Sequence, residues 1–133
     1  MIIHNDFANK DFIFELKTGF VLFEDNSYFP WVILVHKKSV KNMLFLTTEE
    51  RLELMKDIEI CEKVINKTYS PFQTNIAIFG NKTPHLHVHI IGRMENDACF
   101  PSPAFQIPAK AYTLEQKQKE IAKLKTAFLK ECV

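Results

Sequence analysis

The chain has 133 residues, 47% of them hydrophobic and 25% charged, which suits a single domain with a sizeable buried core. Its formal net charge is +1, so no overall field draws it to nucleic acid or to an anionic membrane, and any recognition of phosphate must be local. No apolar run reaches the length of a membrane span, no signal peptide is recognisable, and the three cysteines are widely spaced, which together predict a cytoplasmic protein with reduced thiols.

Three short apolar runs come first, at residues 12–16, 20–23 and 31–35. They are rich in Phe, Val and Ile, which are residue types that favour β-strands. Residues 17–19, between the first two runs, are few enough for a hairpin turn. The three runs therefore predict an antiparallel meander.

A helix is predicted next. Thr47 and Glu50 have the pattern of a capping box, in which each side chain accepts a hydrogen bond from the other residue's backbone amide. Apolar residues then recur at three- and four-residue spacing through about residue 66, as in a helix with one buried stripe. The stripe expected to be buried consists of Leu52, Met55, Ile58, Cys61 and Ile65.

Two more strands are expected at residues 72–79 and 85–93, joined by a turn at 80–84. A second helix is expected at about 113–131, with Thr113 and Gln116 as a second capping box. Residues 94–112 before it form an irregular tail that contains prolines. The residues that this helix is expected to bury are Leu114, Ile121, Leu124 and Phe128.

These elements predict the α+β class, with one domain over residues 1–133 and a core from about 11 to 93. We expect an antiparallel sheet of about five strands, a central amphipathic helix and a C-terminal helix packed against it. With only three glycines, the chain contains neither a phosphate-binding loop of the Walker type nor a dinucleotide-binding fingerprint.

Three of the five histidines lie within five residues, in the run His85-Leu86-His87-Val88-His89. On a strand, alternate side chains share a face, so the three imidazoles face one way while Leu86, Val88 and Ile90 face the other. The aliphatic face suits a core under the helices. The imidazole face is then expected on the opposite, open side of the sheet.

Three interpretations of this pattern are open. A metal site is one, but at about 3.3 Å per residue His85 and His89 lie roughly 13 Å apart, so a metal would need two of them and ligands from elsewhere. Nothing in the sequence brings His4 or His36 to that place. A polar strand face with no chemical role is the second interpretation.

The third interpretation is nucleophilic catalysis. The middle imidazole, His87, has a partner on each side, so one neighbour can hold its ring and tautomer while the other donates a hydrogen bond to the reacting group. An imidazole with a pKa of about 6.5 is largely neutral, and so nucleophilic, near pH 7. Backbone amides of the turn at 80–83, where Gly80 allows a close approach, suit the negative charge of a phosphate.

The run His85-Leu86-His87-Val88-His89-Ile90-Ile91 resembles the signature of the histidine-triad (HIT) family, in which histidines alternate with apolar residues. Residues 23–25, 31–38, 46–50 and 75–78 are similar to other segments of that family, so the resemblance covers roughly residues 20–93. It implies a hydrolase or transferase that cleaves nucleotides at an α-phosphate, with phosphoramidates or dinucleoside polyphosphates as substrates. It also implies a covalent nucleotidyl-histidine intermediate, no metal in the attacking step and a homodimer.

Carried over by the resemblance, His87 is the nucleophile, His89 assists at the α-phosphate and the leaving group, and His85 supports the site. Asn75 and Asn81 are expected to contact the nucleotide or its phosphate. Arg93 is a further candidate for a phosphate contact, because its guanidinium is planar and always charged. Asp25 is the candidate for binding the ribose.

Several positions depart from the family's usual pattern. The loop before the triad is shortened to Gly80-Asn81-Lys82-Thr83-Pro84, with Asn81 where glutamine is usual. Trp31 stands where another histidine is common, and His36 stands where a proline is common. The shortened loop, Arg93 and the prolines of the tail resemble a bacterial subgroup, which often has glutamine where this chain has His85. The shortened loop favours an alternative function, a nucleotide-binding module without activity; a metal-binding protein is the third.

Overall fold

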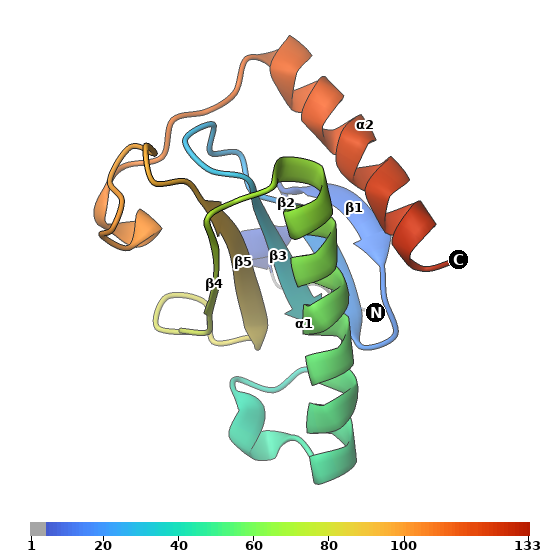
Figure 1. Ribbon diagram of the computed structural model, residues 1–133. Coiled ribbons are helices and arrows are strands. Elements are labelled where there is room, and N and C mark those ends of the chain that lie inside the picture. The colour runs from blue at the N-terminus through green and yellow to red at the C-terminus, as the bar shows by residue number, and fades with distance from the viewer. Residues whose placement is uncertain (1–4) are drawn as a thin grey trace.

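The computed structural model describes residues 5–133, which form a five-stranded antiparallel sheet of order β1-β2-β3-β5-β4 (Figure 1). The α+β class and the opening antiparallel meander are therefore confirmed. The histidine strand lies inside the sheet, between β3 and β4. The strands are β1 (Asp11–Glu15), β2 (Gly19–Phe23), β3 (Trp31–His36), β4 (Gln73–Ala77) and β5 (His87–Arg93).

The last two strands are shorter than predicted. β4 ends at Ala77 rather than at residue 79, and β5 begins at His87 rather than at His85. The reason lies in the turn, where the backbone N–H of His85 donates to the carbonyl of Thr83 instead of joining the ladder. His85 is therefore placed by the turn, and His87 and His89 by the sheet.

The long helix α1 (Thr48–Tyr69) lies across one face of the sheet, and α2 (Leu114–Glu131) packs beside it and against β1 (Figure 1). The capping box at Thr47 and Glu50 is confirmed, since each side chain accepts from the other residue's backbone N–H at 3.1 and 2.7 Å. At α2 only half of the predicted box is formed in the described chain: Thr113 accepts from the N–H of Gln116.

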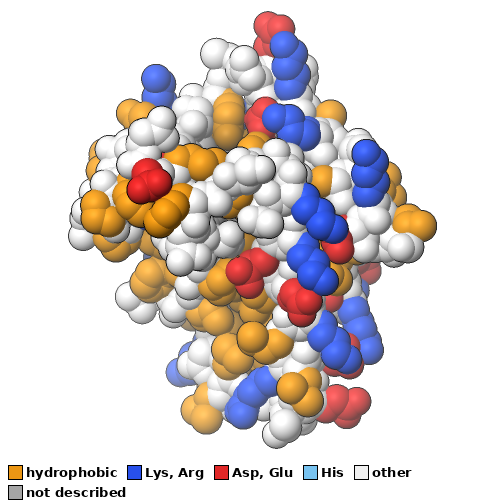
Figure 2. All heavy atoms as spheres, in the orientation of Figure 1, with side chains coloured by type: hydrophobic (Ala, Val, Ile, Leu, Met, Phe, Trp, Pro, Cys, Tyr) orange, Lys and Arg blue, Asp and Glu red, His pale blue; other side chains and the backbone are white. Residues whose placement is uncertain are grey.

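The predicted buried stripes were partly wrong. Leu52 and Met55 of α1 are more than half exposed, and Leu54 takes their place in the core. Three residues turn a helix by about 300°, which is about 60° short of a full turn. Residues that follow one another at this spacing therefore move gradually around the helix and off its buried face. In α2, Leu124 and Phe128 are buried while Leu114 is exposed. Figure 2 shows hydrophobic side chains gathered around the beginning of α1, while charged side chains follow the rest of that helix.

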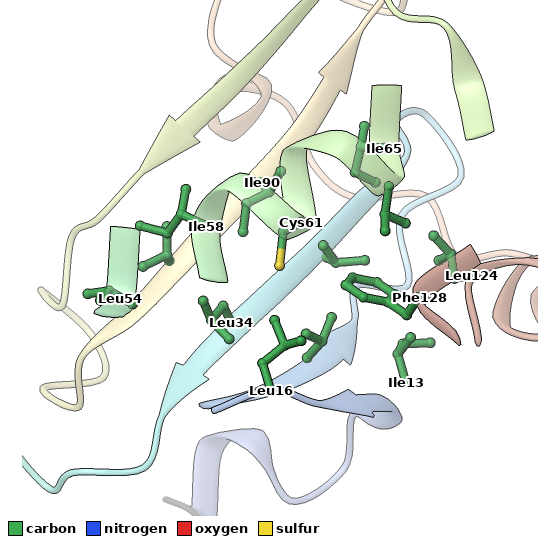
Figure 3. Close-up of a cluster of buried hydrophobic side chains, with 14 of the residues drawn as sticks. Ile13, Leu16, Leu34, Leu54, Ile58, Cys61, Ile65, Ile90, Leu124 and Phe128 are labelled. Atoms are coloured by element: carbon green, nitrogen blue, oxygen red, sulfur yellow. The ribbon is translucent and has the colours of Figure 1, made fainter. Parts of the chain in front are cut away.

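The main core fills the space between the helices and the sheet (Figure 3). Leu86, Val88 and Ile90 belong to it, as the alternation in the histidine run predicted. Among residues 5–133, no helix is long and apolar enough to cross a membrane. Other members of this core are Ile13, Leu16, Leu34, Leu54, Ile58, Cys61, Ile65, Leu124 and Phe128.

The opposite face of the sheet, which carries the imidazoles, is covered rather than open as predicted. A second apolar cluster lies on this face and includes Phe7, Phe29, Trp31 and Ala104. Two single-turn 3₁₀ segments lie on this face, η1 (Asn5–Phe7) before β1 and η3 (Ala104–Gln106) in the tail; a third, η2 (Met43–Phe45), precedes α1. The tail at 94–112 is irregular apart from η3, as expected.

Candidate active site

His87 and His89 are neighbours on the face of β5 that the tail covers. His87 pairs with Val35 across the sheet, and His89 pairs with Ile33 on one side and Ala77 on the other. The two imidazole centroids are 5.1 Å apart, and both side chains are less than a tenth exposed. The ladder thus holds the two rings side by side in a largely dry environment.

The tautomer of His87 follows from its hydrogen bond. Nδ1 of its ring lies 2.6 Å from the backbone carbonyl oxygen of His85. Because a carbonyl only accepts, Nδ1 must carry the hydrogen, and in the neutral ring Nε2 keeps its lone pair. His87 therefore has its free electron pair on the outer nitrogen, which makes no hydrogen bond to any residue in 5–133.

His89 has the opposite tautomer. The indole Nε1–H of Trp31 donates to Nδ1 of His89 at 3.1 Å, so Nδ1 is the acceptor and the hydrogen of the neutral ring lies on Nε2. Trp31 itself is 5% exposed, and its ring packs edge-on against that of His89. Trp31 was noted in the sequence only as a departure from the family pattern, yet it decides which nitrogen of His89 is a donor.

His85 supports this pair from the turn. Its Nε2 donates to the backbone carbonyl of His36 at 2.7 Å, while its own backbone carbonyl accepts a hydrogen bond from Nδ1–H of His87. The ring of His36 points elsewhere and accepts from the N–H of Lys38 at 2.9 Å. His85 thus acts through the orientation of His87, and its side chain does not border the cavity described next.

A cavity of about 440 Å³ opens above the two imidazoles. Its two sides differ in chemistry, with the Lys10–Glu24 ion pair (2.6 Å) on the β1–β2 side and aromatic rings on the β4 side. A volume of this size suits a small organic ligand. The cavity is lined by Asp6, Phe7, Lys10, Glu24, Ile33, Phe79, Gly80, Asn81, Lys82, Thr83, His87, His89 and Phe105.

The environment lowers the pKa of both imidazoles. Burial lowers the pKa of His89 to about 3, and positive charge on His87 and Lys10 acts in the same direction. Burial also lowers the pKa of His87 below its ordinary value, although its hydrogen bond to the carbonyl of His85 opposes this. Near pH 7 both rings are therefore neutral, with a lone pair on one Nε2 and a hydrogen on the other.

The structure brings only some of the predicted residues to the cavity. His87, His89 and Asn81 line it, and Gly80 before Asn81 has the positive φ of 81° that glycine favours. Asp25 does not, because its carboxylate accepts from the backbone N–H of Tyr112 at 2.8 Å.

Asn75 and Arg93 also lie away from the cavity, and they are bonded to each other. Arg93 is 2% exposed, and its guanidinium donates to Asp97 at 2.8 and 3.1 Å, to Asn75 at 3.1 Å and to the carbonyl of Ser102 at 2.8 Å. With its donors occupied in this way, Arg93 ties the tail to the end of β5.

Several lining residues were not found from the sequence. Lys10 and Glu24 are 14 residues apart, and only the pairing of β1 with β2 brings them together. Phe105 arrives from the tail and packs on Trp31 and His89 with centroids 5.1 and 5.0 Å apart. Contacts between such distant residues produce no regular spacing in the sequence. The only indication of a role for Phe105 was its position among the prolines of the tail.

A metal centre needs several ligand side chains arranged around one point. Within residues 5–133, no group of three or more His, Cys, Asp or Glu side chains is arranged to hold a metal ion. His4, one of the histidines considered for such a role, lies outside the described residues. What the arrangement does present is one imidazole lone pair next to one imidazole N–H.

Comparisons with known proteins agree with this geometry. A family model described as the HIT domain matches residues 6–96. The histidine triad protein blr8122 from Bradyrhizobium japonicum superposes with a TM-score of 0.89 at 26% identity, covering 96% of this chain and 97% of that one. A histidine triad protein from Marinobacter aquaeolei VT8 also gives a TM-score of 0.89, at 27% identity over 97% of this chain and 96% of that one.

A curated relative is the asymmetrical bis(5'-nucleosyl)-tetraphosphatase of Schizosaccharomyces pombe. It is 32% identical over 71 residues, which are 50% of this chain but 39% of that protein, so the match spans well under half of the relative's length. The family model covers more than half of this chain and includes the histidine strand. The chain belongs to the HIT family.

Proposed function

We propose that the protein is a nucleotide hydrolase or nucleotidyl transferase that cleaves at an α-phosphate, with His87 as the covalent nucleophile. The observation that carries this proposal is the pair of opposite tautomers, one lone pair and one N–H on adjacent outer nitrogens. Membership of the HIT family and the name of the Schizosaccharomyces pombe relative support dinucleoside polyphosphates as the class of substrate. Nucleoside phosphoramidates are the second class that we propose, on the resemblance of the histidine run alone.

In the first step, the lone pair of His87 Nε2 forms a bond to the α-phosphorus. The bond from phosphorus to the leaving oxygen or amine nitrogen breaks, and the leaving group keeps that electron pair. An amine nitrogen also takes up a proton from the solvent as it leaves. The ring of His87 then carries a positive charge, which the hydrogen bond from Nδ1 to the carbonyl of His85 stabilises. His89 Nε2–H donates a hydrogen bond to a phosphate oxygen or to the leaving atom, which lowers the cost of the developing charge.

In the second step, water or another acceptor attacks the phosphorus, and the proton that it loses passes to the solvent. The bond from phosphorus to Nε2 breaks, and the electron pair returns to His87. The products with water are a nucleoside monophosphate and the free imidazole. Backbone amides of the turn at 80–83 and the side chain of Lys82 are the donors we assign to the phosphate oxygens.

The nucleoside is assigned to the β1–β2 side of the cavity. Glu24 borders the cavity there, and its carboxylate can exchange its bond with Lys10 for the hydroxyl groups of a ribose. We therefore assign to Glu24 the role that the sequence suggested for Asp25.

The three cysteines form no disulfide, which supports our proposal that the protein acts in the cytoplasm.

The test is a hydrolysis panel of adenosine and guanosine phosphoramidates and dinucleoside tri- and tetraphosphates. His87→Ala should lower kcat at least about a thousandfold for the best substrate, because the nucleophile is lost. A quenched reaction of the wild-type protein should show the mass of a nucleotide on a peptide that contains His87.

His36→Asn is the matched control, because that ring is also buried but does not border the cavity. It should leave turnover within about twofold of the wild-type value. Unchanged turnover in His87→Ala would mean that the mechanism is wrong.

A nucleotide-binding module without activity is the second candidate, and the short turn at 80–84 favours it because it offers few backbone amides to a phosphate. In that case the wild-type protein would turn over no member of the panel. A nucleoside monophosphate would still raise its Tm, since a ligand that binds the folded state stabilises it.

A further inference from the structure

Two phenylalanine rings stand at the edge of the cavity beside His89. Phe79 follows β4 and Phe105 belongs to η3, and their centroids are 4.8 Å apart in an edge-to-face arrangement. Both border the cavity, yet Phe79 is 53% and Phe105 43% exposed. They leave apolar surface in contact with water at the mouth of the site.

These rings are held in place from behind. Phe105 packs on Trp31 and His89 at centroid distances of 5.1 and 5.0 Å, and Phe79 lies 6.3 Å from His89. The tail that carries Phe105 is tied to β5 by the buried Arg93. The rings therefore form a preorganised wall, which a ligand can use with little loss of conformational entropy.

The wall and the ion pair lie at opposite sides of the reacting histidines. Lys10 and Glu24 flank β1 and β2, whereas Phe79 follows β4, which is the strand on the other side of β5. A nucleotide whose ribose meets Glu24 and whose α-phosphorus meets His87 has its remaining substituent on the β4 side. That substituent is the leaving group.

We infer that Phe79 and Phe105 form a subsite for the leaving group, and that this subsite takes a flat aromatic group. The inference rests on the proposed function and adds to it the chemistry of the leaving group. Edge-to-face and offset stacking favour an aromatic ring over an aliphatic one at such a wall. The ring has two possible sources: the second base of a dinucleoside polyphosphate, or the aromatic amine of a phosphoramidate.

The test compares kcat/KM within two substrate pairs that differ only at the leaving group. The first pair is diadenosine tetraphosphate and adenosine tetraphosphate; the second is adenosine phosphoramidate with tryptamine and with ammonia. The wild-type protein should prefer the aromatic member of at least one pair, and that pair identifies the source. Phe79→Ala and Phe105→Ala should each lower this preference by about twofold to tenfold, the range expected for one aromatic contact.

Phe12→Ala is the matched control, because Phe12 is 49% exposed but does not border the cavity, and it should leave the preference unchanged. Phe105→Leu keeps an apolar side chain and a stable tail but removes the ring, and should lower the preference as Phe105→Ala does. The inference is overturned if the wild-type protein shows no preference in either pair, or if the preference survives in all three ring variants.

Failure of the proposed function gives a different result, in which the wild-type protein turns over neither member of either pair. Calorimetric binding of the same compounds to His87→Ala protein then tests the subsite by itself. Tighter binding of an aromatic member, lost in the double variant with Phe105→Leu, supports the subsite. Equal binding of both members overturns it.

Discussion

At the scale of single residues, two identical side chains acquire different roles from the atoms behind them. A backbone carbonyl fixes the hydrogen of His87 on Nδ1, and an indole N–H fixes the hydrogen of His89 on Nε2. A strand presents both rings on one face, but only their partners leave a lone pair on Nε2 of His87 and a hydrogen on Nε2 of His89. The position of each proton is thus a property of the folded chain.

The first prediction concerns Trp31. Trp31→Phe keeps the aromatic packing but removes the indole N–H, which leaves Nδ1 of His89 buried without a donor. Unfolding free energy should fall by about 1–3 kcal/mol, the cost of an unsatisfied buried acceptor, and kcat by about tenfold, because His89 no longer has a single tautomer. Urea denaturation and steady-state kinetics measure the two effects.

Phe29→Leu is a suitable comparison, because it alters an aromatic neighbour of Trp31 that bonds to neither histidine. It should lower stability but leave kcat within about twofold of the wild-type value. If Trp31→Phe lowered stability but left kcat unchanged, the indole would be only a packing residue.

The second prediction concerns pH. The folded state lowers the pKa of His36, His87 and His89, in each case chiefly by burial. Below about pH 6.5 the unfolded chain binds protons at these rings that the folded chain resists, so stability is full above that pH and falls as the pH is lowered. For His89, whose folded pKa is about 3, the loss between pH 6.5 and 5 should be about 2 kcal/mol.

Thermal unfolding measured from pH 7 to pH 5 checks this, since the carboxyl groups titrate mostly below that window. His89→Asn should make the decline of Tm with falling pH shallower. A decline as steep as that of the wild-type protein would show that His89 does not resist protonation in the folded state.

At the scale of elements, a buried network of hydrogen bonds around Arg93 and Asp97 joins the end of β5 to the tail. Asp97 accepts from Arg93 and from the backbone N–H groups of Met94, Cys99 and Phe100. Both side chains of this ion pair are almost fully buried. This network replaces regular secondary structure in the tail, where the prolines remove backbone donors.

The third prediction is that Asp97→Ala destabilises the protein by about 3–5 kcal/mol, because it leaves the charge of Arg93 buried without its partner. Glu59→Ala is the control: Glu59 and Lys63 also form a pair four residues apart, at 3.1 Å, but both are more than half exposed. It should cost less than about 0.5 kcal/mol. Equal effects in urea denaturation would contradict the role given to the buried pair.

The accuracy of sequence-based prediction differed between the elements for physical reasons. Caps and strands depend on local chemistry, so the start of α1 at Thr47 and the histidine alternation of β5 were predictable. The buried face of α1 was not, because Leu52 and Leu54 both fit an apolar spacing and only packing against the sheet selects Leu54. The roles of Glu24, Trp31 and Phe105 depend on contacts between distant segments, which no local pattern records.

At the scale of the whole molecule, β4 is one of the two edge strands of the sheet, and exposed apolar side chains lie on it and on α1. Among the described strands it pairs with β5 alone, and its Ile76 is 40% exposed. On α1, Leu52 and Met55 are also exposed. Bare edges and apolar patches of this kind are usually covered, so we propose that a second copy of the chain pairs along β4.

The fourth prediction is a dimeric mass in sedimentation experiments. Ile76→Lys should weaken the dimer at least about tenfold, because it would bury an unpaired charge. Leu129→Lys is the control. Leu129 is 57% exposed on α2, which packs against β1, and β1 is at the opposite edge of the sheet from β4. A monomeric wild-type protein, or equal loss of the dimer in both variants, would contradict this interface.

β5 connects the two histidines to the segment that carries Phe105. His87 begins the strand and Arg93 ends it, and Arg93 tethers the tail that brings Phe105 back over His89. The two histidines and Phe105 are therefore encoded in one contiguous stretch, residues 87–105, but at separate positions, while Phe79 comes from the segment before it. On our proposal, substitutions at residue 105 change which leaving groups are accepted, while the sequence of β5 and its histidines stays the same.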